Sequence, residues 1–135
     1  MNEALMPFVD TVFKNDVPIL LENGEYLPTL YILQKGKGLL YNLAPSDAND
    51  LREMAKSALE QTPDADAYAL AYAPEGSSNG TRMALFTVEF CGRNDSEAAV
   101  LAVACDLDAK KMVSDCVQRP SADSLFSRPQ NGLCS

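Results

Sequence analysis

The chain of 135 residues contains no histidine and no tryptophan. Without histidine it can hold neither a Ser-His-Asp triad nor a Cys-His pair, and metal sites that depend on imidazole are excluded. The four cysteines form no CxxC pair, so we expect free thiols. We therefore expect no catalytic residue, no metal and no cofactor.

Basic residues are scarce as well: 11 lysines and arginines stand against 19 aspartates and glutamates, for a net charge of −8. A surface of that sign disfavours binding to nucleic acid or to an anionic membrane. No apolar run approaches the roughly 20 residues that a transmembrane helix needs, and the amino terminus lacks the pattern of a secretory signal. We expect a cytoplasmic protein that contacts neither nucleic acid nor membrane.

Motifs for phosphate and calcium are incomplete. The glycine-rich segments 35–38 and 76–80 lack the Gly-Lys-Ser/Thr ending of a P-loop. The pairs Asp64-x-Asp66 and Asp106-x-Asp108 lack the glycine of a calcium loop. Hairpin turns and solvated strand ends explain these residues better.

The most informative stretch that is present, residues 82–107, predicts a long β-hairpin. From Ala84 to Phe90, apolar residues recur at every second position, which is the period of a strand. Turn residues follow at 92–96. The next run, 98–105, is apolar throughout, so we expect that strand to be covered on both faces.

The remaining patterns predict two helices and three further strands. The expected elements are a helix within 2–15, strands at 27–34 and 38–43, a helix that begins at Ser46 and ends before Pro63, and a strand at 66–73. Pro18 should stop the first helix, so residues 17–21 are expected to be extended or a packed connection. Residues 74–81 should form a flexible connection.

Together these elements predict one α+β domain at residues 1–118 and an irregular C-terminal tail at residues 119–135. Short links favour antiparallel pairing, so we expect a mainly antiparallel sheet of about five strands, with both helices on one face (α-β-β-α-β-β-β). Leu125 and Phe126 are the tail residues expected to hold the tail to the domain.

Six residues are candidates for an interface or a pocket: Tyr68, Tyr72, Met83, Leu85, Glu89 and Cys91. Tyr68 and Tyr72 share one strand face, for which plain packing is the alternative. Glu89 lies mid-strand on an otherwise apolar face, so a carboxyl group that transfers protons is one interpretation. The interpretation we favour is that this face is half exposed, or that Glu89 meets Arg82, Arg93 or a cation of a partner chain.

The order of elements over residues 2–108 resembles that of the roadblock and profilin-like group, in which a helix, a hairpin, a helix and three strands build one sheet. This resemblance implies a domain that dimerises and acts as an adaptor or a sensor. Locally, the segment ENGEYLPTL at 22–30, with ADA at 65–67, is similar to a group of small uncharacterised bacterial proteins of unknown function. That similarity implies no activity.

The surplus apolar face of the hairpin carries the functional prediction. Either the tail or a second copy of the chain must cover it. We predict a second copy, which makes the chain a non-enzymatic interaction or scaffold module that forms a homodimer, a larger assembly or a complex with another protein. The alternative is a small-molecule sensor with a pocket between sheet and helices. An enzyme that uses Cys91 or Glu89 is the third hypothesis, and the absence of histidine disfavours it most.

Overall fold

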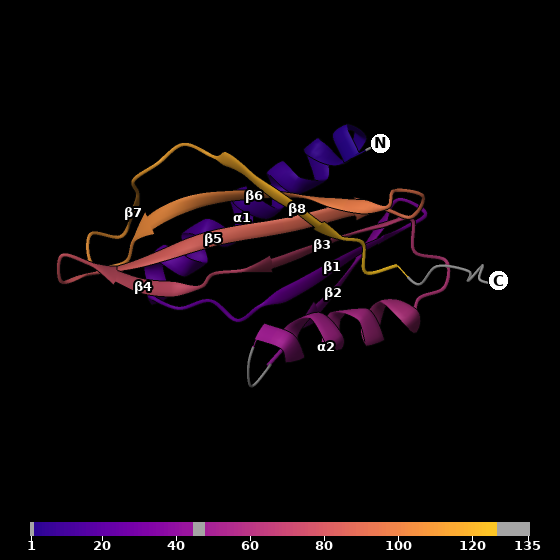
Figure 1. The fold of residues 1–135 in the computed structure, drawn as a ribbon, viewed down its shortest axis with the longest axis horizontal. Coiled ribbons are helices and arrows are strands. Elements are labelled where there is room, and N and C mark those ends of the chain that lie inside the picture. The colour runs from indigo at the N-terminus through magenta and orange to yellow at the C-terminus, as the bar shows by residue number, and fades with distance from the viewer. Residues whose placement is uncertain (1, 45–47, 127–135) are drawn as a thin grey trace.

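The computed structural model describes residues 2–44 and 48–126, which form two α-helices and one eight-stranded sheet (Figure 1). The elements are η1 (Asn2–Leu5), α1 (Met6–Asn23), β1 (Thr29–Gln34), β2 (Lys37–Asn42), α2 (Ala48–Glu60), β3 (Ala67–Tyr72), β4 (Glu75–Ser78), β5 (Thr81–Gly92), β6 (Glu97–Asp106), β7 (Lys111–Met112) and β8 (Val117–Asp123). The strand order is β2-β1-β3-β5-β6-β7, while β4 also pairs with β5 and β8 with β6. All pairs are antiparallel. The α+β class and the antiparallel sheet are confirmed, but the sheet has eight strands and not about five.

The predicted hairpin forms the centre of the sheet. β5 and β6 pair from Met83 with Asp106 to Phe90 with Ala99. The segment expected to be a flexible connection contains β4, which pairs with the start of β5. Between β4 and β5, Asn79 and Gly80 adopt positive φ angles of 53° and 82°, which suits a two-residue hairpin turn. Local turn chemistry therefore orders this connection.

Helix α1 continues through Pro18 to Asn23, so the expectation of an extended segment at 17–21 is wrong. A proline inside a helix costs about 3 kcal/mol, because one backbone hydrogen bond is lost. Val17 and Leu20, on either side of Pro18, are buried against the sheet, and each such burial contributes about 1.5–3 kcal/mol. Packing of these two side chains therefore offsets the proline. The helix ends where Gly24 adopts a φ of 75° and donates its N–H to the Leu20 carbonyl at 2.8 Å.

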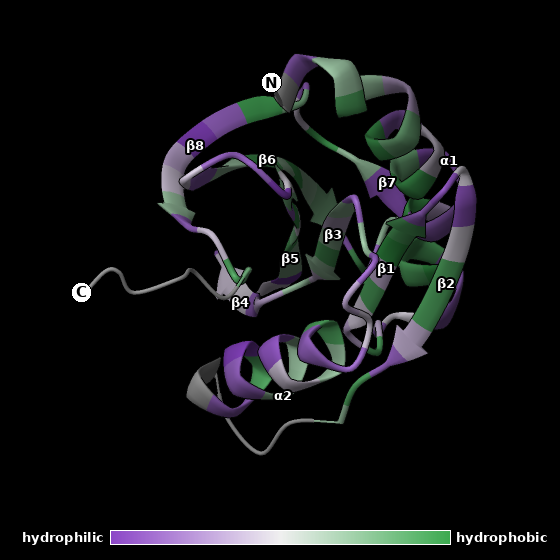
Figure 2. Cartoon of the chain, turned by 90° about the vertical axis from the view of Figure 1, so that its right-hand side faces the viewer, coloured by the Kyte–Doolittle hydropathy of each residue, from purple (hydrophilic) through white to green (hydrophobic). Residues whose placement is uncertain are grey.

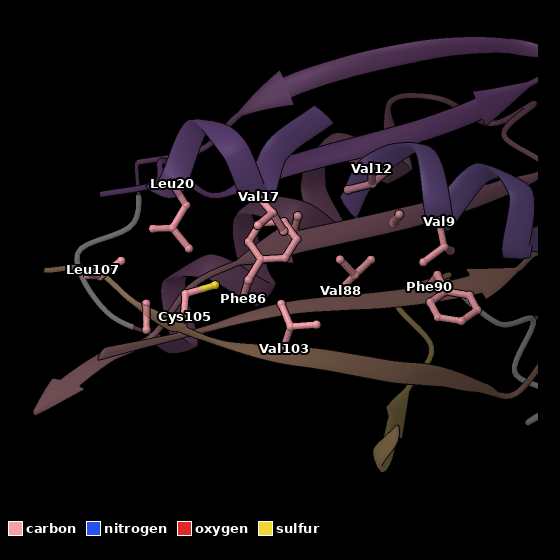
Figure 3. Close-up of a cluster of buried hydrophobic side chains, with 13 residues drawn as sticks. Val9, Val12, Val17, Leu20, Phe86, Val88, Phe90, Val103, Cys105 and Leu107 are labelled. Atoms are coloured by element: carbon pink, nitrogen blue, oxygen red, sulfur yellow. The ribbon is translucent and has the colours of Figure 1, made fainter. Parts of the chain in front are cut away.

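The two helices lie on opposite faces of the sheet, which corrects the expectation that both share one face (Figures 1 and 2). Helix α1 packs on the face that carries Phe86, Val88 and Val103 (Figure 3). Helix α2 packs on the other face, against Tyr68 and Leu70. Because β3 is apolar on both faces, each face can bury a helix, and strand periodicity alone does not assign a helix to one of them.

The C-terminal segment covers the part of the second face that α2 leaves open. β8 pairs with β6, so residues 119–123, expected to be irregular, belong to a strand. Leu125 and Phe126 are buried in the same cluster as the α2 residues, which confirms that they hold this segment to the domain. Residues 127–135, the rest of the expected tail, lie outside the described residues. The chain thus covers much of its own second face, and the surplus surface that favoured a second copy there is reduced.

A buried carboxylate connects α1 to the sheet on the first face. Asp16 is 4% exposed, and its Oδ2 accepts hydrogen bonds from the hydroxyl groups of Tyr26 at 2.6 Å and Tyr31 at 2.5 Å. Burial, followed by the hydrogen bond to Asp16, raises the pKa of both phenols above their ordinary value. Both tyrosines therefore stay protonated and act as donors. They tie the middle of α1 to β1 and to the loop before it.

Candidate ligand-binding pocket

A pocket of about 300 Å³ lies on the second face and is lined by residues of β3, β5, β6 and β8 and of the loop after β3. It is lined by Tyr72, Pro74, Leu85, Thr87, Glu89, Val100, Arg119, Pro120 and Ala122. In Figure 2, β5, β6 and β8 follow one curve. The pocket residues of β5, such as Glu89, share the face on which α2 packs. The volume is at the small end of the range found for ligand pockets.

Glu89 is the central polar residue of this pocket and is 6% exposed. Its Oε1 accepts a hydrogen bond at 2.6 Å from Nη1 of Arg52, with which it forms an ion pair. Its Oε2 accepts a hydrogen bond at 2.5 Å from the hydroxyl of Tyr72. These charge-assisted bonds hold a buried carboxylate that would otherwise be costly to remove from water.

Tyr72 acts as a neutral donor in this cluster. The pKa of Tyr72 is raised above its ordinary value, mostly by burial. The hydrogen bond to Glu89 and the negative charge of that carboxylate raise it further. The phenol therefore remains protonated at neutral pH. The charge of Glu89 is thus balanced by Arg52, and Tyr72 adds no charge.

Arg52 also connects the pocket to the end of β8. Its Nη2 donates a hydrogen bond at 2.9 Å to the backbone carbonyl of Asp123. Beyond that point the Leu125 N–H donates at 3.0 Å to the hydroxyl of Tyr68, and the rings of Phe126 and Tyr68 meet edge to face at 5.4 Å. The same arginine thus orients the pocket carboxylate and anchors the strand that covers the pocket.

Arg119 supplies a second positive charge at the edge of the pocket. It is exposed and pairs in register with Val100, which in turn pairs with Glu89. Directly paired residues of antiparallel strands share a face, so Arg119 and Glu89 lie on the same face with one strand between them. Within residues 2–44 and 48–126, no ion pair is formed by Arg119. The pocket therefore carries a local charge of about +1, although the chain is acidic as a whole.

The six sequence-predicted candidates share this face, but the pocket unites only Tyr72, Leu85 and Glu89. Tyr68 and Cys91 are fully buried in the α2 core. Met83 is half-buried farther along β5, between Gly76 and Asp106.

The expectation of an ion pair at Glu89 is correct in kind, but the cation is Arg52. Arg82 instead pairs with Glu75 at 3.0 Å, and Arg93 donates to backbone carbonyls, among them that of Ala65 at 2.5 Å.

Sequence reasoning missed three polar residues of the site: Arg52, Thr87 and Arg119. Arg52 follows Leu51, the first residue of the buried stripe on α2, so its position next to that stripe was a usable signal. No pattern marked Arg119, because the segment that carries it was expected to be irregular. Thr87 is buried, and its hydroxyl donates to the Leu85 carbonyl at 2.9 Å.

The described cysteines do not form disulfides. Cys91 and Cys105 are buried and Cys116 is exposed, and none of these three is part of a disulfide. Cys91 lies in the α2 cluster and Cys105 in the α1 cluster, on opposite faces of the sheet. Cys134 lies outside the described residues.

The chain matches no family model, no curated protein and no solved structure. The resemblance to the roadblock and profilin-like group therefore stays a prediction. Among the described residues, no helix is long and apolar enough to cross a membrane. In the same part of the chain, no three acidic or cysteine side chains lie close enough together to hold a metal ion.

Proposed function

We propose that this chain is a non-enzymatic domain that binds a small polar molecule in the pocket beneath β8. The observation that carries the proposal is the pocket itself, because its wall combines apolar side chains with a few polar groups held in place by hydrogen bonds. Ligand sites typically have this composition, in which the apolar wall supplies contact area and the polar groups supply orientation. We therefore prefer the sensor alternative from the sequence, although this pocket is lined by strands and the adjoining loop and not by sheet and helices as expected.

The contacts of the two candidate catalytic residues favour recognition over catalysis. Cys91 is fully buried, and its thiol contacts the backbone carbonyls of Gly92 at 3.3 Å and Glu97 at 3.5 Å, so a substrate has no route to it. Glu89 has each of its oxygens engaged, one by Arg52 and one by Tyr72. A carboxylate held in this way is suited to accept a hydrogen bond from a ligand, since each oxygen keeps a further lone pair.

Filling the pocket provides the test. Ala122 is half-buried in the pocket wall, so Ala122→Leu should occupy the space of a ligand. Gln118, on the same strand, is exposed and does not line this pocket, so Gln118→Leu adds a similar apolar group outside it.

A panel of small polar molecules should be measured against the wild type and both variants by ligand-observed NMR. We expect binding to the wild type and to Gln118→Leu, and loss of binding in Ala122→Leu. A panel that binds no better to the wild type than to Ala122→Leu would refute the proposed pocket.

Self-association remains a second candidate function, favoured by a different surface. Strand β2 lies at the edge of the sheet, and all six of its residues are exposed. Leu39, Leu40 and Tyr41 are large apolar residues in this strand with 37%, 55% and 39% exposure. An exposed apolar edge strand is a template for pairing with another strand.

The oligomeric state tests this second candidate. If two β2 edges pair, size-exclusion chromatography with light scattering should give a dimer for the wild type and a monomer for Leu40→Lys, because an edge lysine opposes pairing. Lys56→Gln, a change to an exposed residue on α2, should leave the dimer intact. A monomeric wild type at micromolar concentration would exclude this function.

A further inference from the structure

We infer that the pocket beneath β8 takes a small organic monocarboxylate that also carries a hydroxyl group, with the carboxylate at Arg119 and the hydroxyl at Glu89. This inference rests on the proposed function and specifies the chemical class of the ligand.

The charge of the pocket sets the charge of the ligand. Glu89 and Arg52 form an ion pair and cancel each other, while Tyr72 donates its proton to a hydrogen bond and is neutral. Arg119 is the charged group that remains, and none of the ion pairs within the described ranges involves it. A ligand with one negative charge complements this set, and a guanidinium binds a carboxylate through two parallel hydrogen bonds.

The position of Glu89 sets the second functional group. Glu89, Val100 and Arg119 lie in one row across three strands, so the backbones of Glu89 and Arg119 are separated by two strand spacings, about 10 Å. A molecule whose carboxylate contacts Arg119 can therefore extend its other end toward Glu89. That end must donate a hydrogen bond, because an ionised carboxylate only accepts.

A hydroxyl group fits this second position better than an ammonium or a second carboxylate does. The guanidinium of Arg52 lies 2.6 Å from Glu89, and a ligand ammonium there would meet a like charge. A second carboxylate would be repelled by Glu89 itself. Thr87 also lines the pocket, and because its hydroxyl already donates to the Leu85 carbonyl, its oxygen can serve a ligand only as an acceptor.

The walls and the volume limit the size of the molecule. Val100 lies between the two polar ends, and Leu85 and Pro120 add to the apolar wall of the pocket, which suits a short carbon chain. A pocket of about 300 Å³ is at the lower limit of drug-sized sites. Straight-chain ω-hydroxy acids with a few carbons therefore have the right charge, donor and length.

Isothermal titration calorimetry with the full chain tests the ligand class. The probes are 4-hydroxybutanoate and its homologues of three to six carbons, with butanoate, butane-1,4-diol, succinate and 4-aminobutanoate as comparisons. We expect the best hydroxy acid to bind more tightly than each comparison compound, because only the hydroxy acid satisfies both ends.

Variants at the pocket edge test the role of Arg119. Arg119→Gln should weaken binding of the best hydroxy acid about tenfold to a hundredfold, the effect of losing a hydrogen bond to a charged group, and Arg119→Lys should restore part of it. Lys56→Gln removes the same charge from an exposed position on α2 and should leave binding unchanged. Because Arg119 is exposed, the Gln variant should keep the melting temperature of the wild type.

The outcomes separate this inference from the proposed function. If succinate, the amine or the diol binds most tightly, or if Arg119→Gln binds the hydroxy acid as well as the wild type does, the ligand class is wrong. The proposed function is still supported in that case if Ala122→Leu abolishes binding of whichever compound binds the wild type most tightly. If no probe binds the wild type, the ligand class is also overturned, and the broader panel compared across Ala122→Leu decides whether the proposed function survives.

Discussion

Replacing Arg52 should lower the free energy of unfolding, because Glu89, the buried carboxylate of the pocket, then loses its ion-pair partner. In Arg52→Met, Glu89 keeps the hydrogen bond from Tyr72 but loses its ion-pair partner, and the Asp123 carbonyl loses a donor. Removing one partner of a fully buried pair costs about 3–5 kcal/mol. The Arg52 side chain is 36% exposed, so water can replace part of the interaction, and we expect a loss of about 2–3 kcal/mol in the free energy of unfolding.

Urea denaturation followed by circular dichroism measures this loss at neutral pH. Lys56→Met, an apolar replacement of an exposed cation on the same helix, should change the free energy of unfolding by about 0.5 kcal/mol or less. Arg52→Lys keeps the charge without the forked guanidinium, so it should fall between the wild type and Arg52→Met.

A double-mutant cycle identifies Glu89 as the source of the effect. Once Glu89→Gln removes the negative charge, Arg52→Met should cost less than it does in the wild type, with a coupling energy of about 1–3 kcal/mol. The reasoning fails if Arg52→Met destabilises no more than Lys56→Met, or if the two substitutions at Arg52 and Glu89 are additive.

Three further predictions concern the tyrosines and the C-terminal anchor. Tyr31→Phe removes one of two donors to the buried Asp16 and should cost about 1–2 kcal/mol in urea denaturation, whereas the exposed Tyr41→Phe should have little effect. Burial raises the pKa of Tyr68 above its ordinary value of 10.0; the folded state thus retains this proton more strongly than the unfolded state. The stabilisation that this raised pKa provides is complete below about pH 10 and is lost as the pH rises further, by up to about 1.4 kcal/mol per pH unit. Above pH 10 the melting temperature of Tyr68→Phe should therefore fall less steeply with pH than that of the wild type. Phe126→Ala should cost about 3 kcal/mol, since the ring is 6% exposed and packs on Tyr68, and unchanged stability would show that this segment does not anchor β8.

The surface that motivated the prediction of self-association is largely internal in the folded chain. The sequence correctly indicated that the hairpin strands are apolar on both faces, and it identified the tail or a second copy as the cover. In the structure β8, Leu125 and Phe126 supply much of that cover. Apolar side chains that stay exposed include Leu39, Leu40 and Tyr41 on β2, at one edge of the sheet, and Met112, Val113 and Val117 near β7 and β8. A hypothesis about assembly is therefore better tested at these exposed edges, β2 first, than on the second face of β5 and β6.

Local patterns in the sequence were sufficient for the two helices, for five of the eight strands and for part of the site. Alternation between Ala84 and Phe90 predicted the central strand, because side chains of a strand alternate between two faces whatever surrounds them. The same argument placed Glu89 on an apolar face and left two favoured interpretations, a half-exposed face or a pairing with a cation, of which the ion pair with Arg52 is the one found. The absence of histidine restricted the possible chemistry before any fold was considered.

The tertiary structure decided what depends on residues distant in the chain. Pro18 remains inside a helix because Val17 and Leu20 find a sheet to pack on, and a local rule about proline contains no information on that packing. Arg52 reaches Glu89 across 37 positions of sequence and Arg119 reaches the same face through two strand pairings, so neither contact has a periodic signature. Which face each helix covers, and hence that a pocket forms beneath β8, follows from how all the apolar faces are buried together.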